Sequence, residues 1–175
     1  MAFKHGSKAA VYYGGVDVSA YLTSAVGDLC RLVPALSTAY GQSSVIDDAV
    51  AFSWGVTGAA ALAFGKIIHN SEDTNTTTGT GIDGTASTST GWTAHLHVTL
   101  VDGGSWVVTI QDSADNSSFA TIATFAAKTA VGSERLTSAA ATTTVRRYVR
   151  VVATRTGGSA GQGITYALGF ARTNQ

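Results

Sequence analysis

Residues 92–101 read WTAHLHVTLV, and apolar and polar side chains alternate along this segment. In an extended chain one face would carry its apolar positions, which are Ala94, Leu96, Val98 and Leu100. The opposite face would carry Thr93, His95, His97 and Thr99. A period of two over this length is typical of a half-buried antiparallel strand. The segment therefore predicts a sheet that is packed on one side.

The rest of the C-terminal part repeats this pattern of strand and turn. Further strands are expected at residues 105–112, 119–125, 134–139, 144–154 and 164–172. The first two follow the segment 92–101 after short turns, so the three together predict a meander. Strands that recur about every 8–12 residues between turn signals are typical of a β-sandwich or a jelly roll.

The N-terminal part is predicted to form an arm or a hairpin. Residues 9–13 (AAVYY) and 16–22 (VDVSAYL) read as strands that the Gly14-Gly15 pair would join in a tight turn. Residues 28–40 carry apolar positions at helical spacing, but Pro34 in their middle favours a short turn or loop.

Between these parts, strands are expected at 49–56 and 59–68, and the Thr/Ser/Gly-rich residues 70–91 are expected to form a loop. The sequence thus predicts an all-β chain in two parts. Residues 1–48 would form an N-terminal arm or hairpin region, and residues 49–175 an antiparallel β-sandwich or jelly-roll domain.

The composition favours a structural subunit. Of 175 residues only 13% are charged, the net charge is zero, and 45% are hydrophobic. A free monomer ordinarily carries more surface charge, since charge opposes self-association. Cys30 is the only cysteine, which excludes a disulfide scaffold. No run of about 18 apolar residues is present, and the N-terminus lacks the apolar stretch of a signal peptide, so we expect no membrane contact and assembly in the cytoplasm.

The charges are unevenly spread along the chain. From Lys128 onward there are seven bases against one acid, hence +6, whereas the residues before it hold four bases and ten acids, hence −6. Such a split suits either a basic face for nucleic acid or surfaces of opposite sign that meet between copies of the chain. Arg146, Arg147 and Arg150 lie in a β-branched run that reads as a strand, which favours contacts between copies over direct nucleic-acid binding.

Two groups of residues have the chemistry of metal ligands. His95 and His97 lie two apart on a strand and could bind a metal with His69, although a solvent or interface face is the favoured interpretation. A second group, Asp112, Asp115 and Asn116, could coordinate Ca²⁺. Asp and Asn more often form turns, and we favour that role.

No catalytic signature is present. The chain lacks a nucleophile elbow, Cys30 has no positioned histidine, and no paired acids stand in an apolar setting, so neither an enzyme nor a cofactor is expected. Trp92, Trp106 and Phe119 could form a platform for sugar rings, although core packing is favoured for Trp106.

Several stretches resemble the C-terminal domain of major tail or tail-tube-like structural proteins of tailed bacteriophages. They read LHVTLV, IQDSADNSSFATIATF, GSERL, RRYVRVVAT and YALGFAR, and the opening MAFKHGSKAAVYYGGVDVSAYLTSA is similar to that family's N-terminus. The resemblance implies a virion subunit with a β-sandwich and no enzymatic activity. Family members carry a longer segment between these ends than residues 26–50 provide.

This shortened middle favours a capsid-decorating protein, with a tail-tube protein and a virion-surface carbohydrate-binding module as alternatives. The expected partners are copies of the same chain and the major capsid protein or other virion proteins, within a virion assembled in the host cytoplasm. Aromatic and arginine side chains contribute much of the binding energy at interfaces. We therefore expect contacts at Tyr12, Tyr13 and Tyr21 in the arm and at Arg146, Arg147 and Arg150 on the basic side.

Overall fold

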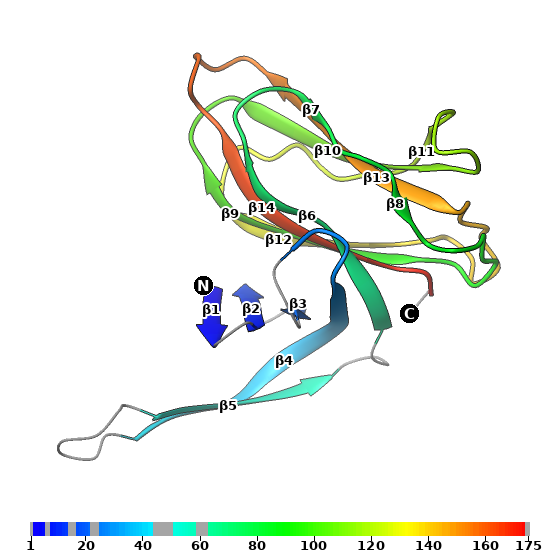
Figure 1. The fold of residues 1–175 in the computed structure, drawn as a ribbon. Helices are drawn as coiled ribbons and strands as arrows, with labels where there is room; N and C mark the ends of the chain where they lie inside the picture. Colours follow the sequence, from blue (N-terminus) through cyan, green and yellow to red (C-terminus); the bar gives the residue numbers. More distant parts are fainter. Residues whose placement is uncertain are drawn as a thin grey trace.

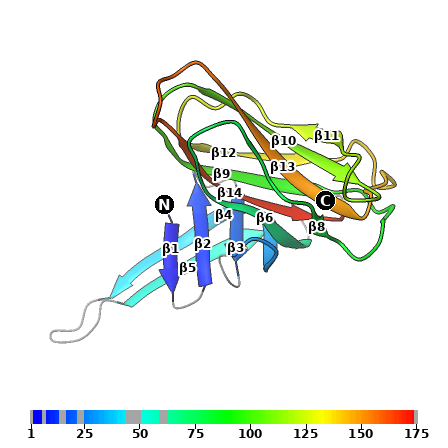
Figure 2. The same ribbon diagram turned by 45° about the horizontal axis from the view of Figure 1, so that its top comes forward.

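The computed structural model describes residues 2–5, 8–13, 17–21, 25–43, 51–58 and 63–173, and it describes side chains for 25–32 and 63–173. Within these ranges every regular element is a β-strand, and the strands form two antiparallel sheets (Figures 1 and 2). The all-β prediction is confirmed, and the body of the molecule is an antiparallel β-sandwich. Its jelly-roll variant stays a prediction.

The larger sheet has nine described strands in the order β1-β2-β3-β4-β6-β14-β9-β12, with β5 paired to β4. These are β1 (Ala2–His5), β2 (Lys8–Tyr13), β3 (Asp17–Tyr21), β4 (Leu29–Ser43), β5 (Ala51–Gly58), β6 (Ala63–Asp73), β9 (Thr93–Val101), β12 (Gly132–Thr137) and β14 (Ile164–Ala171). The smaller sheet runs β11-β10-β13-β7, with β8 also on β13. Its strands are β7 (Thr77–Thr78), β8 (Ile82–Asp83), β10 (Ser105–Ser113), β11 (Ala120–Thr124) and β13 (Tyr148–Thr156).

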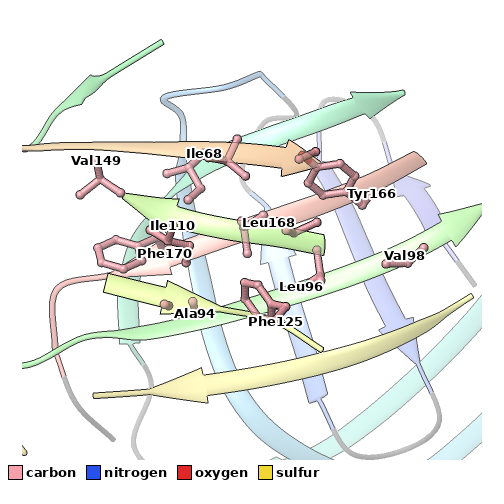
Figure 3. Packing of buried hydrophobic residues seen from close by; sticks show 14 of the residues in the cluster. Ile68, Ala94, Leu96, Val98, Ile110, Phe125, Val149, Tyr166, Leu168 and Phe170 are labelled. Carbon is pink, nitrogen blue, oxygen red and sulfur yellow. The ribbon is translucent and has the colours of Figure 1, made fainter. Parts of the chain in front are cut away.

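The main core lies between the two sheets (Figure 3). From β9 it takes the apolar positions of the alternating segment, Ala94, Leu96 and Val98, which are fully buried. β14 contributes every second residue, from Ile164 to Phe170. Trp106, Val108 and Ile110 of β10 pack against them from the smaller sheet. The period-two pattern thus marks the core-facing positions 94, 96 and 98. The predicted packing on one side only is wrong, because His95 and His97 on the opposite face are buried as well, and Leu100 is 47% exposed.

The predicted meander is wrong, because β9 and β10 belong to different sheets. β9 pairs with β14 and β12, and only β10 and β11 form the expected hairpin. The connecting turn contains Gly103 and Gly104 at φ 89° and 74°. Backbone of this left-handed kind suits glycine, which has no Cβ to clash, and here the turn takes the chain from one layer to the other.

The turn or loop predicted for residues 28–40 is also wrong, because these residues lie in β4 apart from Asp28. On one side of β4, Leu29–Leu32 pairs with β6 and Ala35–Ser43 pairs with β5. Pro34 falls in the gap between these two partners. Proline has no N–H to donate, and a position where pairing passes from one strand to another tolerates that loss.

The N-terminal strands continue the larger sheet. β2 and β3 form the predicted hairpin, with Tyr13 opposite Asp17, while its Gly14-Gly15 turn lies outside the described residues. β3 pairs with β4, and β4 with β6. The expected boundary after residue 48 falls between β4 and β5, two strands that pair in a long hairpin projecting from the body (Figure 1). Most of the region predicted as a loop at 70–91 is irregular, but its strands β7 and β8 pair with β13.

Candidate assembly interface

An apolar groove opens at the end of the sandwich where β4 and β6 begin. Leu29 pairs with Lys66, and Arg31 pairs with Phe64, so these four residues share one face of the larger sheet. Leu29 is 59% exposed and Phe64 is 68% exposed. The groove has a volume of about 200 Å³. Its apolar walls are Leu29, Phe64, Ile68, Ile82, Val149 and Phe170.

The opposite face of these strands is buried in a second, smaller core. This core contains Cys30, Leu32, Ala63, Ile67, Ala167 and Ala171. Gly65 stands among them, and a Cβ at this position would come within 2.4 Å of the Phe170 carbonyl oxygen. Only glycine allows β6 and β14 to approach this closely. Because both faces of β6 carry apolar residues, its sequence AFGKII shows no clear alternation, which hid the exposure of Phe64.

Basic side chains surround the groove. Lys66 Nζ donates a hydrogen bond to the backbone oxygen of Asp83 at 2.9 Å. The Arg172 guanidinium donates to three backbone carbonyl oxygens, those of Val145, Arg146 and Arg147, at 2.6–3.1 Å. Neutral carbonyls accept these hydrogen bonds, while the Asp83 carboxylate, which also lines the groove, offsets part of the positive charge. The sequence signal for this site is the spacing of Phe64 and Lys66. They lie two residues apart in a strand, so a cation and a large apolar side chain point to the same face.

Arg146, one of the predicted interface residues, forms an intramolecular ion pair with Asp112. Its Nε and Nη2 atoms donate to Asp112 Oδ1 at 2.8 and 2.6 Å, and its backbone N–H donates to Oδ2 at 2.8 Å. The Asp112 side chain is only 4% exposed. These hydrogen bonds raise the pKa of Arg146 above its ordinary value. The pair therefore ties the start of β13 to the end of β10.

The other two predicted arginines also have partners within the chain. Arg147 donates to both carboxylate oxygens of Asp83 at 2.8 and 2.6 Å, which lowers the pKa of Asp83 to about 2. Arg150 donates to Gln111 Oε1 at 2.9 Å, and its guanidinium lies 3.8 Å from the centre of the Phe119 ring. The side chains of the predicted contacts Tyr12, Tyr13 and Tyr21 lie outside the described residues.

The ion pairs show where the two oppositely charged parts of the sequence meet. Asp83 and Asp112 belong to the acidic part, whereas their partners Arg147 and Arg146 belong to the basic part. Some of the opposite charges of the two sequence parts are therefore paired with each other within one molecule. Contacts between copies through these arginines stay a prediction.

Replacing Arg146 by alanine should destabilise the fold far more than the same change at Arg147. The first change leaves the buried Asp112 carboxylate without its guanidinium partner, whereas the second breaks an ion pair whose side chains are 45% and 43% exposed. Buried ionic groups that lose a partner are strongly destabilising, and exposed pairs contribute little. We expect the loss of unfolding free energy to be roughly three times larger for R146A. Urea denaturation of both variants measures it, and equal losses would contradict this account of Asp112.

The histidines of the proposed metal site lie on different faces of the larger sheet. His95 and His97 are buried, at 1% and 0% exposure, on the outer face of β9. β3 contacts β12, so the larger sheet bends over this face, and the expected solvent or interface position is wrong because both side chains are buried within the chain. His69 instead lies on the inner side, where its ring stacks on Tyr166 at 3.9 Å. Among the described residues, no group of three or more His, Cys, Asp or Glu side chains is arranged to hold a metal ion.

His69 takes part in a buried polar cluster near the end of β6. Tyr166 donates its hydroxyl hydrogen to Asp73 Oδ2 at 3.0 Å, and the same carboxylate oxygen lies 3.6 Å from His69 Nε2. The Ser71 hydroxyl also approaches Nε2, at 3.2 Å. A nucleophile–base–acid relay needs the hydroxyl and the carboxylate on opposite ring nitrogens, so this geometry does not form one. The cluster instead satisfies polar groups at the end of the core.

The proposed calcium ligands serve the fold in other ways. Asp115 Oδ1 accepts hydrogen bonds from the backbone N–H groups of Ser117 and Ser118 and from the Ser113 hydroxyl. These bonds hold the pKa of Asp115 well below its usual range. Asn116 adopts the left-handed conformation at φ 59°. The turn-forming role is confirmed for Asp115 and Asn116, whereas Asp112 pairs with Arg146.

The aromatic residues considered for sugar binding do not form an exposed platform. Trp92 is 6% exposed, Trp106 is fully buried, and both lie in the core between the sheets. Phe119 is covered by the Arg150 guanidinium. The core-packing interpretation of Trp106 is confirmed, and the platform hypothesis is wrong because stacking on a sugar requires an accessible aromatic face.

Cys30 is buried beneath the strand β14. Burial raises the pKa of its thiol to about 12, so the sulfur stays protonated and is a poor nucleophile.

No family model matches the chain, and no curated protein matches it either. Within the described ranges, no helix is both long and apolar enough to cross a membrane.

Proposed function

We propose that this chain is a non-enzymatic structural subunit of a tailed-phage virion, which associates with copies of itself and docks on other virion proteins. The observation that carries the proposal is the apolar groove, whose walls include Leu29 and Phe64 at more than half exposure. On a neutral chain with few charges, little opposes the burial of such a surface against a neighbour.

The resemblance to tail and tail-tube-like proteins supports the virion setting. The stretches that carry it coincide with strands of the sandwich: LHVTLV lies in β9, RRYVRVVAT covers the start of β13, and YALGFAR covers the end of β14. The resemblance therefore concerns the segments that build the core.

Two positions in the virion suit such a subunit. Capsid decoration, favoured by the short middle of the sequence, requires an arm that grips neighbours. In the structure the strands β1 to β4 instead continue the larger sheet of the sandwich, and β4 and β5 supply a long projecting hairpin. A subunit of this build is suited to contacts on several sides. This observation supports the tail tube more than capsid decoration.

Immunogold labelling of whole virions with an antibody against the purified chain tests the proposal. We expect gold particles along the tails, and labelling of disrupted virions serves as the control for epitopes buried in the assembly. Gold confined to the heads would overturn the tail position in favour of capsid decoration. A chain that is absent from purified virions, by labelling and by mass spectrometry, would overturn the virion proposal as a whole.

A further inference from the structure

A second exposed apolar site lies at the far end of the sandwich. Leu100 is 47% exposed and Val131 is 48% exposed. β12 pairs with β9 with Gly132 opposite Val98, so Leu100 of β9 and Val131, the residue that precedes β12, both lie just beyond this pair. Both side chains therefore belong to one apolar tip, which we define by Leu100 and Val131.

The tip and the groove lie at opposite ends of the molecule. β6 begins at the groove with Phe64, and its far end, at Glu72 and Asp73, pairs with the start of β14. Eight residues of extended strand separate Phe64 from Glu72, a distance of about 27 Å. Figure 3 shows the same polarity, with Phe170 and Val149 toward the groove end and Tyr166 and Val98 toward the tip end.

The two ends carry opposite charge. Within the described residues, the groove end has five bases with four acids, namely Arg31, Lys66, Arg146, Arg147 and Arg172 with Asp28, Asp83, Asp112 and Asp115. The tip end has four acids with two bases, namely Glu72, Asp73, Asp102 and Glu134 with Arg155 and Lys128, and Lys128 pairs with Glu134. Glu72 and Asp102 are exposed. Arg155 donates to the backbone oxygens of Thr74 and Gln162, which holds it against the sandwich.

We propose that the tip of one copy binds in the groove of the next, with Leu100 and Val131 against Leu29 and Phe64. The volume of about 200 Å³ is below that of small-molecule sites, about 300–1,000 Å³, but suits a pair of aliphatic side chains. The opposite charges of the two ends favour this orientation and oppose contacts between like ends. The inference rests on the proposed function as a self-associating subunit and names the surfaces involved.

A contact of this kind joins two different surfaces. It can therefore be repeated from copy to copy, giving a ring if the rotation closes and an open row if it does not. A contact between identical surfaces would instead stop at a dimer. The size of the assemblies therefore tests the proposal, in addition to the strength of self-association.

The experiment uses two variants of the full chain, Phe64→Glu and Leu100→Glu, followed by sedimentation velocity over a range of concentrations. Each variant places a carboxylate at an exposed position, and each should weaken self-association at least about tenfold, since one desolvated charge exceeds the 1.4 kcal/mol equivalent to that factor. Thr154→Glu, at an exposed position on the smaller sheet, is the matched control and should associate like the unmodified chain.

Mixing the two variants gives the decisive result. F64E keeps an intact tip and L100E keeps an intact groove, so an equimolar mixture should form one-to-one dimers and no longer species. A mixture that stays monomeric while the unmodified chain associates would overturn the proposal, and so would variants that associate normally. Far-ultraviolet circular dichroism confirms folding, and Val131→Glu replaces L100E if that variant is unfolded. An unmodified chain that stays monomeric at every concentration would instead contradict the proposed self-associating function.

Discussion

Replacing Trp106 by alanine is expected to lower the free energy of unfolding by about 3–5 kcal/mol, the usual range for removing a large buried aromatic side chain. Trp106 is fully buried between the sheets, and its indole N–H donates to the Gly103 backbone oxygen at 3.1 Å. Its backbone also forms two hydrogen bonds with Lys128, at 2.7 and 3.0 Å. Domains are stable by only about 5–15 kcal/mol, so this single change should bring the protein close to unfolding.

Trp106→Phe provides the matched control, because it keeps an aromatic ring in the core and removes the indole hydrogen bond. We expect its loss to be well under half that of W106A. Urea denaturation followed by circular dichroism measures both values. A loss below about 1 kcal/mol for W106A, typical of surface positions, would contradict the assignment of Trp106 to the core.

Acid is expected to destabilise the fold steeply between about pH 6 and pH 4. Burial lowers the pKa of His95 to about 3, with repulsion from His97 and Arg135 adding to the effect, and burial lowers the pKa of His97 to about 4. The ordinary histidine pKa is near 6.5, so in this range the unfolded chain binds protons that the folded chain does not. Stability from these groups is complete above about pH 6.5 and is lost as the pH falls toward the folded-state values.

Two such histidines give a slope approaching two protons, or about 2.7 kcal/mol per pH unit in the steepest part. The double variant His95→Gln, His97→Gln should flatten this dependence, because glutamine does not titrate. His69 remains in that variant, and its pKa is also lowered by burial, so a smaller slope should persist. Urea midpoints measured from pH 7 to pH 4 test the prediction. An unchanged slope in the double variant would show that other groups govern the acid sensitivity.

This acid sensitivity also illustrates what sequence reasoning could not foresee. The alternation in residues 92–101 correctly placed His95 and His97 on the face opposite Leu96, but the bending of the larger sheet over that face buries them. The sequence of β9 contains no sign of this cover. The cover comes from strands more than 70 residues earlier in the chain.

For the candidate interface, too, the sequence showed some features and only the structure showed others. A basic strand at residues 146–150 was visible in the sequence, but its pairing with Asp83 and Asp112 was not. The exposure of Phe64 was equally hidden, because residues on both faces of β6 are apolar. The solvent exposure of Phe64 depends on how far the smaller sheet extends over β6, and no single segment of the sequence encodes that extent.

The sequence alone determined the all-β class, the core-facing positions of β9 and the approximate places of most strands, because strand periodicity and turn chemistry are properties of about ten neighbouring residues. The tertiary structure decided which strands pair, which turn changes layers, and which arginines find acids within the chain. Arg146 and Asp112 are 34 residues apart. Contacts of this kind form only when the sheets pack, and they leave the two ends of the sandwich with exposed apolar side chains and opposite charge.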